Sequence, residues 1–182
     1  MPTTRRHFLK LSGLSGLALT AGLAELHAGN TNVLAENEYD LIIVGGTPGG
    51  IMAAVAASRQ GKKSLILERT AHIGGLPANG LGATDIATRG ATGGLFVEYV
   101  QRIKAHYVGK YGADSQQAKD CSDGYHFEPS VAAKIFDDFL KESPNATVLT
   151  MRQFDFEPEN LTIQNNRIQR IRVTDRNTKK TE

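Results

Sequence analysis

The sequence YDLIIVGGTPGG at residues 39–50 carries the clearest structural signal in this 182-residue chain. Its first half is an apolar run without alternation, which is typical of a parallel strand buried on both faces of a sheet. Its second half is a glycine-rich turn, and an alanine-rich segment follows at residues 51–60. We predict a strand over residues 39–44 and a helix over residues 51–60, with Pro48 near its first turn and Gly61 as its C-terminal stop.

A second apolar segment completes a repeating unit. Residues 63–68 contain the run Leu65-Ile66-Leu67 and end in the acidic Glu68. Strand, turn, helix and strand together form a βαβ unit of about thirty residues. This order predicts an α/β fold with a Rossmann-like parallel sheet.

The unit has the chemistry of a dinucleotide-binding site. Gly45 permits a sharp turn out of the strand, and Gly50 allows the helix and strand to pack closely. The free N–H groups and the positive dipole end of the helix N-terminus attract a pyrophosphate. Glu68, 18 residues after Gly50, is placed to accept hydrogen bonds from the adenosine ribose hydroxyls.

Thr47 departs from the dinucleotide-binding fingerprint, which has glycine at this second position so that the backbone can approach the pyrophosphate. Its Cβ either shifts the phosphates or is tolerated because Gly46 and Gly49 flank it. The threonine hydroxyl is also a potential donor to a phosphate oxygen.

These residues and those that follow resemble the FAD-dependent oxidoreductase family. Its members open with a GGTPxG loop, continue with an acid and a Gly-Gly pair, and then run through GLGATD, which is found here at residues 80–85. A further match is YHFEP at residues 125–129. The resemblance spans about residues 39–175, and Thr47 is an accepted variation in the family. It implies FAD rather than NAD as the cofactor.

The resemblance also implies where the cofactor binds. Gly74 and Gly75 are expected against the FAD phosphate and ribityl region, and residues 76–85 near the isoalloxazine ring, where glycine leaves room for a flat ring. The predicted cofactor-binding residues are Gly45, Gly46, Thr47, Pro48, Gly49, Gly50, Glu68, Arg69, Gly74, Gly75, Leu81 and Gly82. No catalytic residue is predicted.

Other polar residues carry weaker signals. We interpret His72 as a loop histidine rather than a covalent flavin attachment point or a proton relay. Asp85 is either a polar site residue or the cap of a local turn. His106 and His126 have no partner at metal-ligand spacing, so no metal is predicted.

The remaining segments predict helices and a β-meander. Apolar residues at helical spacing indicate helices over residues 92–109 and from Pro129 to before Pro144, with their apolar stripes in the core. A strand is expected at residues 146–151, and a hairpin at residues 161–174 with Asn165-Asn166 as its turn, followed by a second turn at residues 175–178.

The family that the sequence resembles is considerably longer than this chain. A third strand of the meander should begin where the sequence ends, at Glu182. We therefore expect residues 36–182 to be the N-terminal part of an FAD-binding domain, incomplete at its C-terminus, without the substrate domain and the second flavin-contacting segment.

Residues 1–35 predict a signal peptide. Residues 4–10 read TRRHFLK, and the apolar stretch at residues 11–26 is too short and too polar for a membrane-spanning helix. The paired arginines resemble the bacterial twin-arginine pattern, which directs export of folded proteins, often with a cofactor inserted. This resemblance implies the twin-arginine export machinery as a partner, a periplasmic or extracytoplasmic location, and no stable membrane anchor after cleavage. Sites near residues 24, 28 and 35 are compatible with cleavage.

Composition narrows the function further. Cys121 is the only cysteine, which excludes an internal disulfide, a CxxC redox pair and a cysteine zinc cluster. We interpret it as a structural thiol. The net charge of +2 comes from scattered basic residues, so we expect no nucleic-acid partner.

Three functions remain open at this point. The first is an exported flavoenzyme that transfers a hydride from a small organic substrate to FAD. The second is an NAD(P)-dependent dehydrogenase, because the glycine loop and Glu68 also suit that cofactor. The third is a non-catalytic nucleotide-binding fragment.

Overall fold

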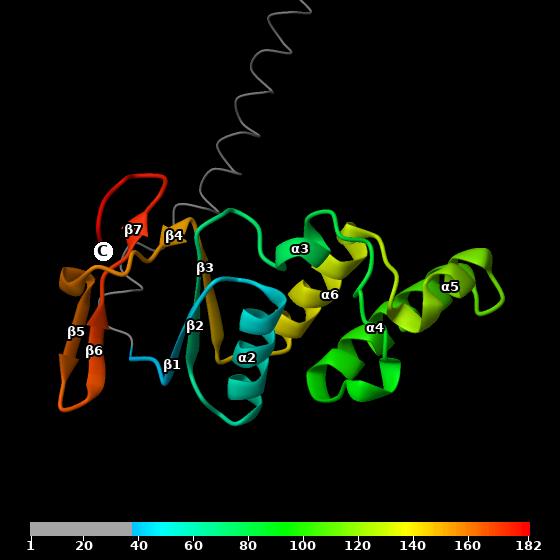
Figure 1. Cartoon of the computed structure of the whole chain (residues 1–182), viewed down its shortest axis with the longest axis horizontal. Coiled ribbons are helices and arrows are strands. Elements are labelled where there is room, and N and C mark those ends of the chain that lie inside the picture. The colour runs from blue at the N-terminus through cyan, green and yellow to red at the C-terminus, as the bar shows by residue number, and fades with distance from the viewer. Residues whose placement is uncertain (1–37) are drawn as a thin grey trace, which may run out of the picture. The chain divides into compact units, whose positions relative to one another are not determined.

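The computed structural model describes residues 38–182, and the predicted signal peptide lies outside these residues. Their centre is a parallel three-stranded sheet formed by β1 (Leu41–Val44), β2 (Ser64–Glu68) and β3 (Ala146–Thr150), in the order β1-β2-β3. Ile66 on β2 pairs with Ile43 on one side and with Val148 on the other. The predicted α/β fold with a parallel sheet is confirmed (Figure 1).

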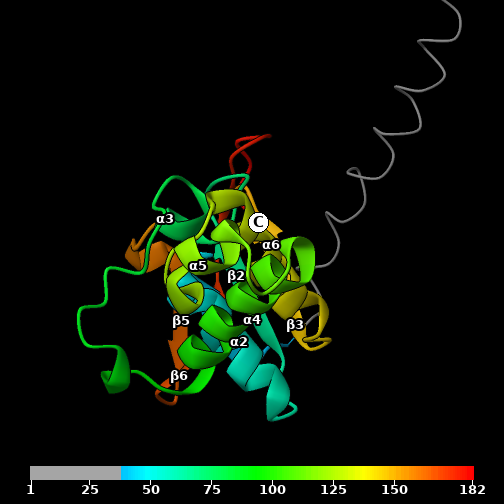
Figure 2. The same cartoon turned by 90° about the vertical axis from the view of Figure 1, so that its right-hand side faces the viewer.

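Three longer helices lie on one side of this sheet: α2 (Pro48–Arg59), α4 (Gly94–Tyr111) and α6 (Pro129–Lys141). Helix α2 contacts all three strands, and α6 contacts both α2 and α4. Figure 2 looks onto this helical side of the molecule. The apolar stripes predicted from the sequence lie in the core, whose most deeply buried side chains include Ile51, Ile66, Ile103, Phe136 and Phe139.

Several short elements were not predicted from the sequence. They are α3 (Gly75–Ala78), α5 (Gln116–Asp120) and the 3-10 turns η1 (Arg89–Ala91), η2 (Ser122–Gly124) and η3 (Pro158–Asn160). Each has at most five residues, fewer than the two helical turns over which an apolar stripe repeats. Helix α2 also begins three residues earlier than the alanine-rich segment, because Pro48 occupies its first turn.

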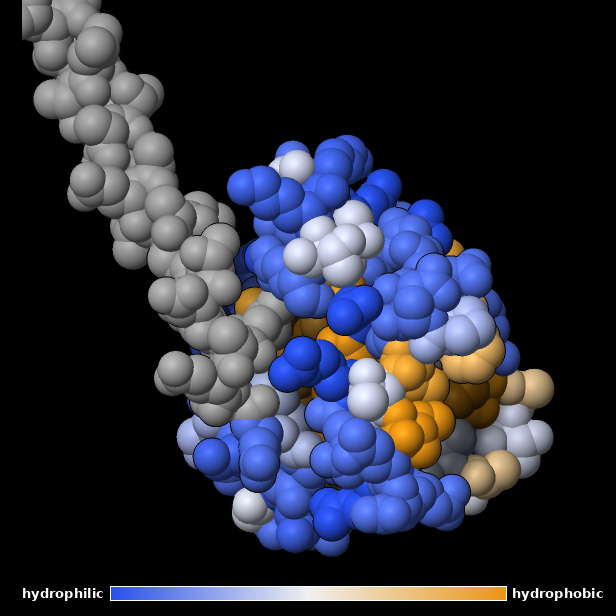
Figure 3. Space-filling view, turned by 90° about the vertical axis from the view of Figure 1, so that its left-hand side faces the viewer, coloured by the Kyte–Doolittle hydropathy of each residue, from blue (hydrophilic) through white to orange (hydrophobic). Residues whose placement is uncertain are grey.

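The prediction that the first strand is buried on both faces is wrong. Val44 is 60% exposed and Ile42 is 37% exposed, although Ile43 between them packs against the core. Strand β1 lies at the edge of the sheet formed by the described residues. Figure 3 views the left-hand side of Figure 1 and shows apolar side chains gathered among polar surroundings. An apolar run indicates that a segment tends to be buried, but the segments packed beside it decide whether its side chains are covered.

The C-terminal meander forms as a hairpin and a separate strand pair. Strands β5 (Leu161–Gln164) and β6 (Arg167–Ile171) are antiparallel, and both turn residues, Asn165 and Asn166, have positive φ, as a tight two-residue turn requires. The prediction of a continuous strand to Thr174 is wrong. Strand β6 ends at Ile171, and β7 (Thr174–Asp175) pairs instead with β4 (Arg152–Gln153).

The ion pair between Arg152 on β4 and Asp175 on β7 holds β7 against β4, so β7 does not continue β6. The Arg152 guanidinium lies 3.4 Å from Asp175 and 3.1 Å from Glu182, and only 11% of its side chain is exposed. Asp175 also accepts hydrogen bonds from the backbone amides of Asn177 and Thr178, which builds the predicted second turn. Thr181 then pairs with Thr174, so a further strand contact begins at the end of the described chain.

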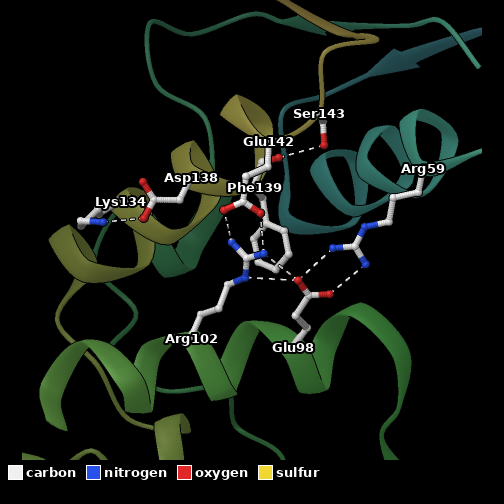
Figure 4. A network of polar contacts seen from close by, with 8 residues as sticks. All are labelled: Arg59, Glu98, Arg102, Lys134, Asp138, Phe139, Glu142 and Ser143. Atoms are coloured by element: carbon white, nitrogen blue, oxygen red, sulfur yellow. Dashed lines mark hydrogen bonds and ion pairs between the residues drawn. The ribbon is translucent and has the colours of Figure 1, made fainter. Parts of the chain in front are cut away.

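A charged network joins the three helices (Figure 4). Arg102 on α4 donates two hydrogen bonds, of 2.7 and 2.6 Å, to Glu142 at the end of α6, and its guanidinium lies 4.0 Å from the ring centre of Phe139. Arg102 also binds Glu98, which in turn accepts two hydrogen bonds of 2.8 Å from Arg59 on α2. The paired, planar geometry distinguishes this network from an isolated surface ion pair.

We predict that Arg102→Gln lowers the free energy of unfolding by about 1 kcal/mol at neutral pH, because it breaks the paired contact between α4 and α6 and removes one partner of Glu98, which binds Arg59 on α2. Urea denaturation measures the change. The matched control is Lys134→Met, which removes the exposed pair between Lys134 and Asp138 within α6 and should cost less than about 0.5 kcal/mol. Equal effects of both variants would contradict the proposed role of the network.

The same variant has a predicted pH dependence. Hydrogen bonds from Arg59 and then Arg102 lower the pKa of Glu98 against the opposing effect of burial, and hydrogen bonds from Arg102 lower the pKa of Glu142. A lowered carboxyl pKa stabilises the folded state above the ordinary value near 4.5 and loses this effect as the pH falls through the folded-state pKa. The difference in the free energy of unfolding between wild type and Arg102→Gln should therefore become smaller as the pH falls below about 4.5.

Candidate functional site

The turn between β1 and α2 forms the floor of the site. Gly45 leaves the strand with φ +107°, a conformation that favours glycine. A Cβ at Gly50 would lie 2.2 Å from the carbonyl oxygen of Gly45, so no side chain fits there. Both glycines therefore have the roles that the sequence predicted for them.

Thr47 is the N-cap of α2. Its backbone is extended, with φ −73° and ψ 167°, and its Oγ1 accepts a hydrogen bond of 3.2 Å from the Gly50 amide. Threonine is accommodated because its φ is negative and its side chain caps the helix, which is an energetically favoured position for this residue type. Since Oγ1 accepts this bond, its own proton is left for another acceptor.

The N-terminus of α2 presents free donors. Among the described residues, the amides of Thr47 and Gly49 have no hydrogen-bond acceptor, as expected for the first turn of a helix. The first turn of α2 contains no acidic side chain. Its positive dipole end is therefore uncompensated there, which favours an anion.

Glu68 joins the end of β2 to this turn. Glu68 is 8% exposed, and its Oε2 accepts a hydrogen bond of 2.8 Å from the Gly46 amide. Its Oε1 accepts two more, of 2.7 Å from the Thr70 amide and 2.8 Å from the Thr70 hydroxyl. Burial raises the pKa of Glu68, but the three hydrogen bonds outweigh it, so the pKa is lowered and the group stays ionised at neutral pH.

Thr70 is a site residue that sequence analysis missed. Its hydroxyl lies 2.8 Å from both Glu68 Oε1 and the His72 carbonyl oxygen, and it holds the carboxylate together with the loop that follows. The only signal in the sequence is a threonine two residues after an acid, a spacing at which side chains bind nearby backbone groups. That spacing is too common to identify Thr70 without the structure.

The Gly74-Gly75 pair lies against the same turn. The Gly74 amide donates a hydrogen bond of 2.7 Å to the Gly46 carbonyl oxygen. A Cβ at Gly75 would lie 2.9 Å from Cδ of Pro48, and one at Gly74 would lie 2.6 Å from Cβ of Ala78. Side chains are thus excluded where the second glycine segment meets the first.

The remaining predicted binding residues lie further from this centre. The carbonyl oxygen of Arg69 accepts a hydrogen bond of 2.7 Å from Arg176, and the Arg69 side chain is exposed. Leu81 lines a cavity whose wall also includes Pro48 and Gly49, and the Gly82 carbonyl oxygen accepts a hydrogen bond from the Phe127 amide. The structure therefore gathers residues 45–50, Glu68 and the Gly74-Gly75 pair, with residues 81–82 on the adjoining segment.

The structure assigns no functional role to the residues that carried weaker signals in the sequence. His72 is exposed, and its backbone rather than its ring contacts Thr70. Asp85 is exposed with φ +54°, and its side chain forms no hydrogen bond with residues 38–182. Cys121 is 3% exposed, and its Sγ donates to the Ala118 carbonyl oxygen, as a structural thiol would.

Two further properties concern only residues 38–182. No three His, Cys, Asp or Glu side chains in this range are grouped closely enough to hold a metal ion. No helix in the same range has the length and apolar character needed to span a membrane.

Comparisons with known proteins identify the family of this chain. A family model described as FAD dependent oxidoreductase matches residues 40–182. A 45-residue segment is 47% identical to 3-oxosteroid 1-dehydrogenase from Comamonas testosteroni, and covers 25% of this chain and 8% of that protein.

A solved structure shows the same fold. Glycerol-3-phosphate dehydrogenase from Bacillus halodurans, complexed with FAD, superposes with a TM-score of 0.50 at 12% identity, over 82% of this chain and 33% of that one. L-amino acid deaminase from Proteus vulgaris gives a TM-score of 0.48 at 14% identity, over 79% and 46% of the two chains. The chain thus spans less than half the length of each of these proteins.

We predict that Thr70→Val lowers the free energy of unfolding by about 1 kcal/mol at neutral pH, because the Glu68 carboxylate loses the partly buried hydrogen bond from the Thr70 hydroxyl. The loss should shrink as the pH falls below about 4.5, where the folded-state stabilisation by ionised Glu68 disappears. Urea denaturation across this pH range measures both effects.

Thr70→Ser is the matched control for this prediction. It keeps the hydroxyl and should retain most of the wild-type stability and pH dependence. A serine variant as unstable as the valine variant would show that the methyl group, and not the hydrogen bond to Glu68, is responsible.

Proposed function

Because the chain belongs to the FAD-dependent oxidoreductase family and FAD is the cofactor of that family, we propose that this protein is an exported flavoenzyme. It takes a hydride from an organic substrate and passes the electrons on. The observation that carries the proposal is the convergence of the α2 N-terminus, the Glu68 carboxylate and the Gly74-Gly75 pair at a single site.

The residues at this site fit the chemical groups of FAD. The free amides of Thr47 and Gly49, with the positive end of α2, suit a diphosphate. Glu68 retains one unused acceptor position on Oε2, since Oε1 accepts two hydrogen bonds and Oε2 accepts one. This position is available to a ribose hydroxyl.

The chemistry of the reaction is divided between cofactor and protein. When bound, FAD supplies the hydride-accepting group. Residues 45–50 bind the diphosphate in this proposal, Glu68 fixes the ribose, Thr70 holds Glu68 in place, and Gly74 with Gly75 keeps side chains away from the cofactor. Arg69, Leu81 and Gly82 complete the proposed binding set at its margins.

Family membership favours the flavoenzyme over the NAD(P)-dependent dehydrogenase, two of the three functions that the sequence left open. FAD, and not NAD(P), is the cofactor of the matched family, so the NAD(P)-dependent dehydrogenase is no longer favoured. The non-catalytic fragment predicts weak FAD retention and no turnover. Turnover by the 182-residue chain would reject it.

We predict that the purified full chain retains FAD, seen as visible flavin absorbance, and that Glu68→Gln weakens FAD binding about ten-fold, because the ribose loses a charge-assisted hydrogen bond. Glu157→Gln is the matched control, since Glu157 is an exposed carboxylate outside the site. A colourless protein that binds NADH more tightly than FAD would overturn the assignment.

We also propose export by the twin-arginine route, followed by residence in the periplasm after cleavage of residues 1–35. The support is the TRRHFLK motif and the short apolar stretch that follows it. In a bacterial host, the wild-type chain should accumulate in the periplasmic fraction, and Arg5→Lys combined with Arg6→Lys should retain it in the cytoplasm. Undiminished export of this double variant would contradict the route.

A further inference from the structure

Residues 85–93 form an exposed strap that joins two walls of the cavity at the proposed cofactor site. Thr84, directly before the strap, and Leu95, two residues after it, both line this cavity. The strap runs along the outside of the molecule between α3 and α4, and only Ile86 and Thr92 within it are partly buried (Figure 2). The position of the strap therefore sets how these two walls of the cavity stand relative to each other.

Both ends of the strap have a left-handed backbone. Asp85 has φ +54°, and Gly94, where α4 begins, has φ +57°. Residues other than glycine are rarely found in this region. The Asp85 side chain forms no hydrogen bond with residues 38–182 that would fix its conformation. Positions of this kind, at the ends of a segment, are where a segment can turn as a unit.

Arg89 tethers the strap at its centre. Its Nη2 donates a hydrogen bond of 2.6 Å to the Ser122 hydroxyl, its Nη1 lies 3.8 Å from the Asp123 carboxylate, and its guanidinium lies 4.3 Å from the ring centre of Tyr125. Its carbonyl oxygen also accepts a long hydrogen bond of 3.5 Å from the Tyr125 hydroxyl. Apart from α4, into which it leads, the strap has no other hydrogen bond to the rest of residues 38–182. We call these contacts of Arg89 the latch.

The turn that receives Arg89 is firmly packed on α4. A Cβ at Gly124 would lie 1.8 Å from the carbonyl oxygen of Val100, so the turn and the helix are in close contact. Lys104 on α4 donates a hydrogen bond of 2.7 Å to Asp123. The turn is therefore held in place, and the strap is the part that can move.

Tyr125 connects the latch to the cavity. Its ring meets Phe96, a residue of the cavity wall, edge-on at a centroid distance of 6.0 Å. Its carbonyl oxygen accepts a hydrogen bond of 3.0 Å from the Thr84 amide. One residue thus contacts the centre of the strap and both walls that the strap joins. Tyr125 is also the first residue of the YHFEP motif, to which the proposed cofactor-binding set assigns no role.

The latch consists of contacts that break easily. The side chains of Arg89 and Asp123 are 44% and 65% exposed, and exposed ion pairs and cation–π contacts are weak. We propose that Arg89 is a positioning residue, which holds the strap through the latch, and that opening of the latch lets FAD enter and leave the cavity. This inference rests on the proposed function, and it does not require Arg89 to touch the cofactor.

Arg89→Gln tests the inference in the full chain. The variant should accelerate both association and dissociation of FAD about five-fold, the effect of losing about one neutral hydrogen bond. The dissociation constant should change less than about two-fold, because the latch is closed in both the free and the FAD-loaded protein. Stopped-flow flavin fluorescence measures both rates, and thermal denaturation of the FAD-free chain checks that the variant is folded.

Three further variants isolate the latch. Arg167→Gln, which changes an exposed arginine on β6, should leave both rates unchanged. Tyr125→Phe keeps the ring that contacts the guanidinium and should stay close to wild type. Ser122→Ala removes only the hydroxyl that binds Arg89 and should accelerate both rates by a smaller factor, so the inference is still tested if Arg89→Gln folds poorly.

Equal FAD exchange rates of wild type, Arg89→Gln and Ser122→Ala would overturn the inference. Faster dissociation with unchanged association would also overturn it, because Arg89 would then stabilise the bound cofactor and not control its passage. Flavin absorbance is measured on the same samples. A wild-type chain that takes up no FAD would contradict the proposed function together with this inference, whereas equal rates in FAD-loaded protein contradict the latch alone.

Discussion

The close backbone contact between Gly50 and the Gly45 carbonyl oxygen is the constraint on which the site depends. Helix α2 can begin directly against the end of β1 only because position 50 has no side chain, since a Cβ would lie 2.2 Å from that oxygen. This contact aims the first turn of α2 at the C-terminal edge of the sheet. The uncapped amides and the dipole of the helix therefore point to one place, where an anionic ligand is stabilised.

The Glu68 carboxylate joins the second strand to that place. It binds the Gly46 amide on one side and Thr70 on the other, and its lowered pKa keeps it charged in a position that is only 8% exposed. A buried charge is tolerated when hydrogen bonds replace its lost hydration. The same bonds leave a single acceptor position open, which in the proposed function binds the ribose of the cofactor.

The helices α2, α4 and α6 have two roles, which the spacing of their apolar residues in the sequence does not distinguish. Ile103, Phe136 and Phe139 fill the core, Arg102 ties α4 to α6 through Glu142, and Glu98 ties α4 to α2 through Arg59. Aromatic residues of the same helices also line a cavity, and the buried Tyr99 hydroxyl has no hydrogen-bond partner among residues 38–182. The same three helices thus contribute apolar side chains to the core and charged side chains to a network that joins them.

The sequence alone determined the βαβ unit, the glycines of the turn, the acidic strand end, the Asn165-Asn166 hairpin and the family, because each depends on residues close together in the chain. Only the tertiary structure decided that β1 is half exposed, that β7 pairs with β4, that Thr70 supports Glu68, and that the Tyr99 hydroxyl has no hydrogen-bond partner within residues 38–182. These features depend on contacts between residues that are far apart in the chain or on the exact rotamer of a polar side chain. Periodicity and composition describe what a segment tends to bury, whereas the packing of distant segments decides what covers it.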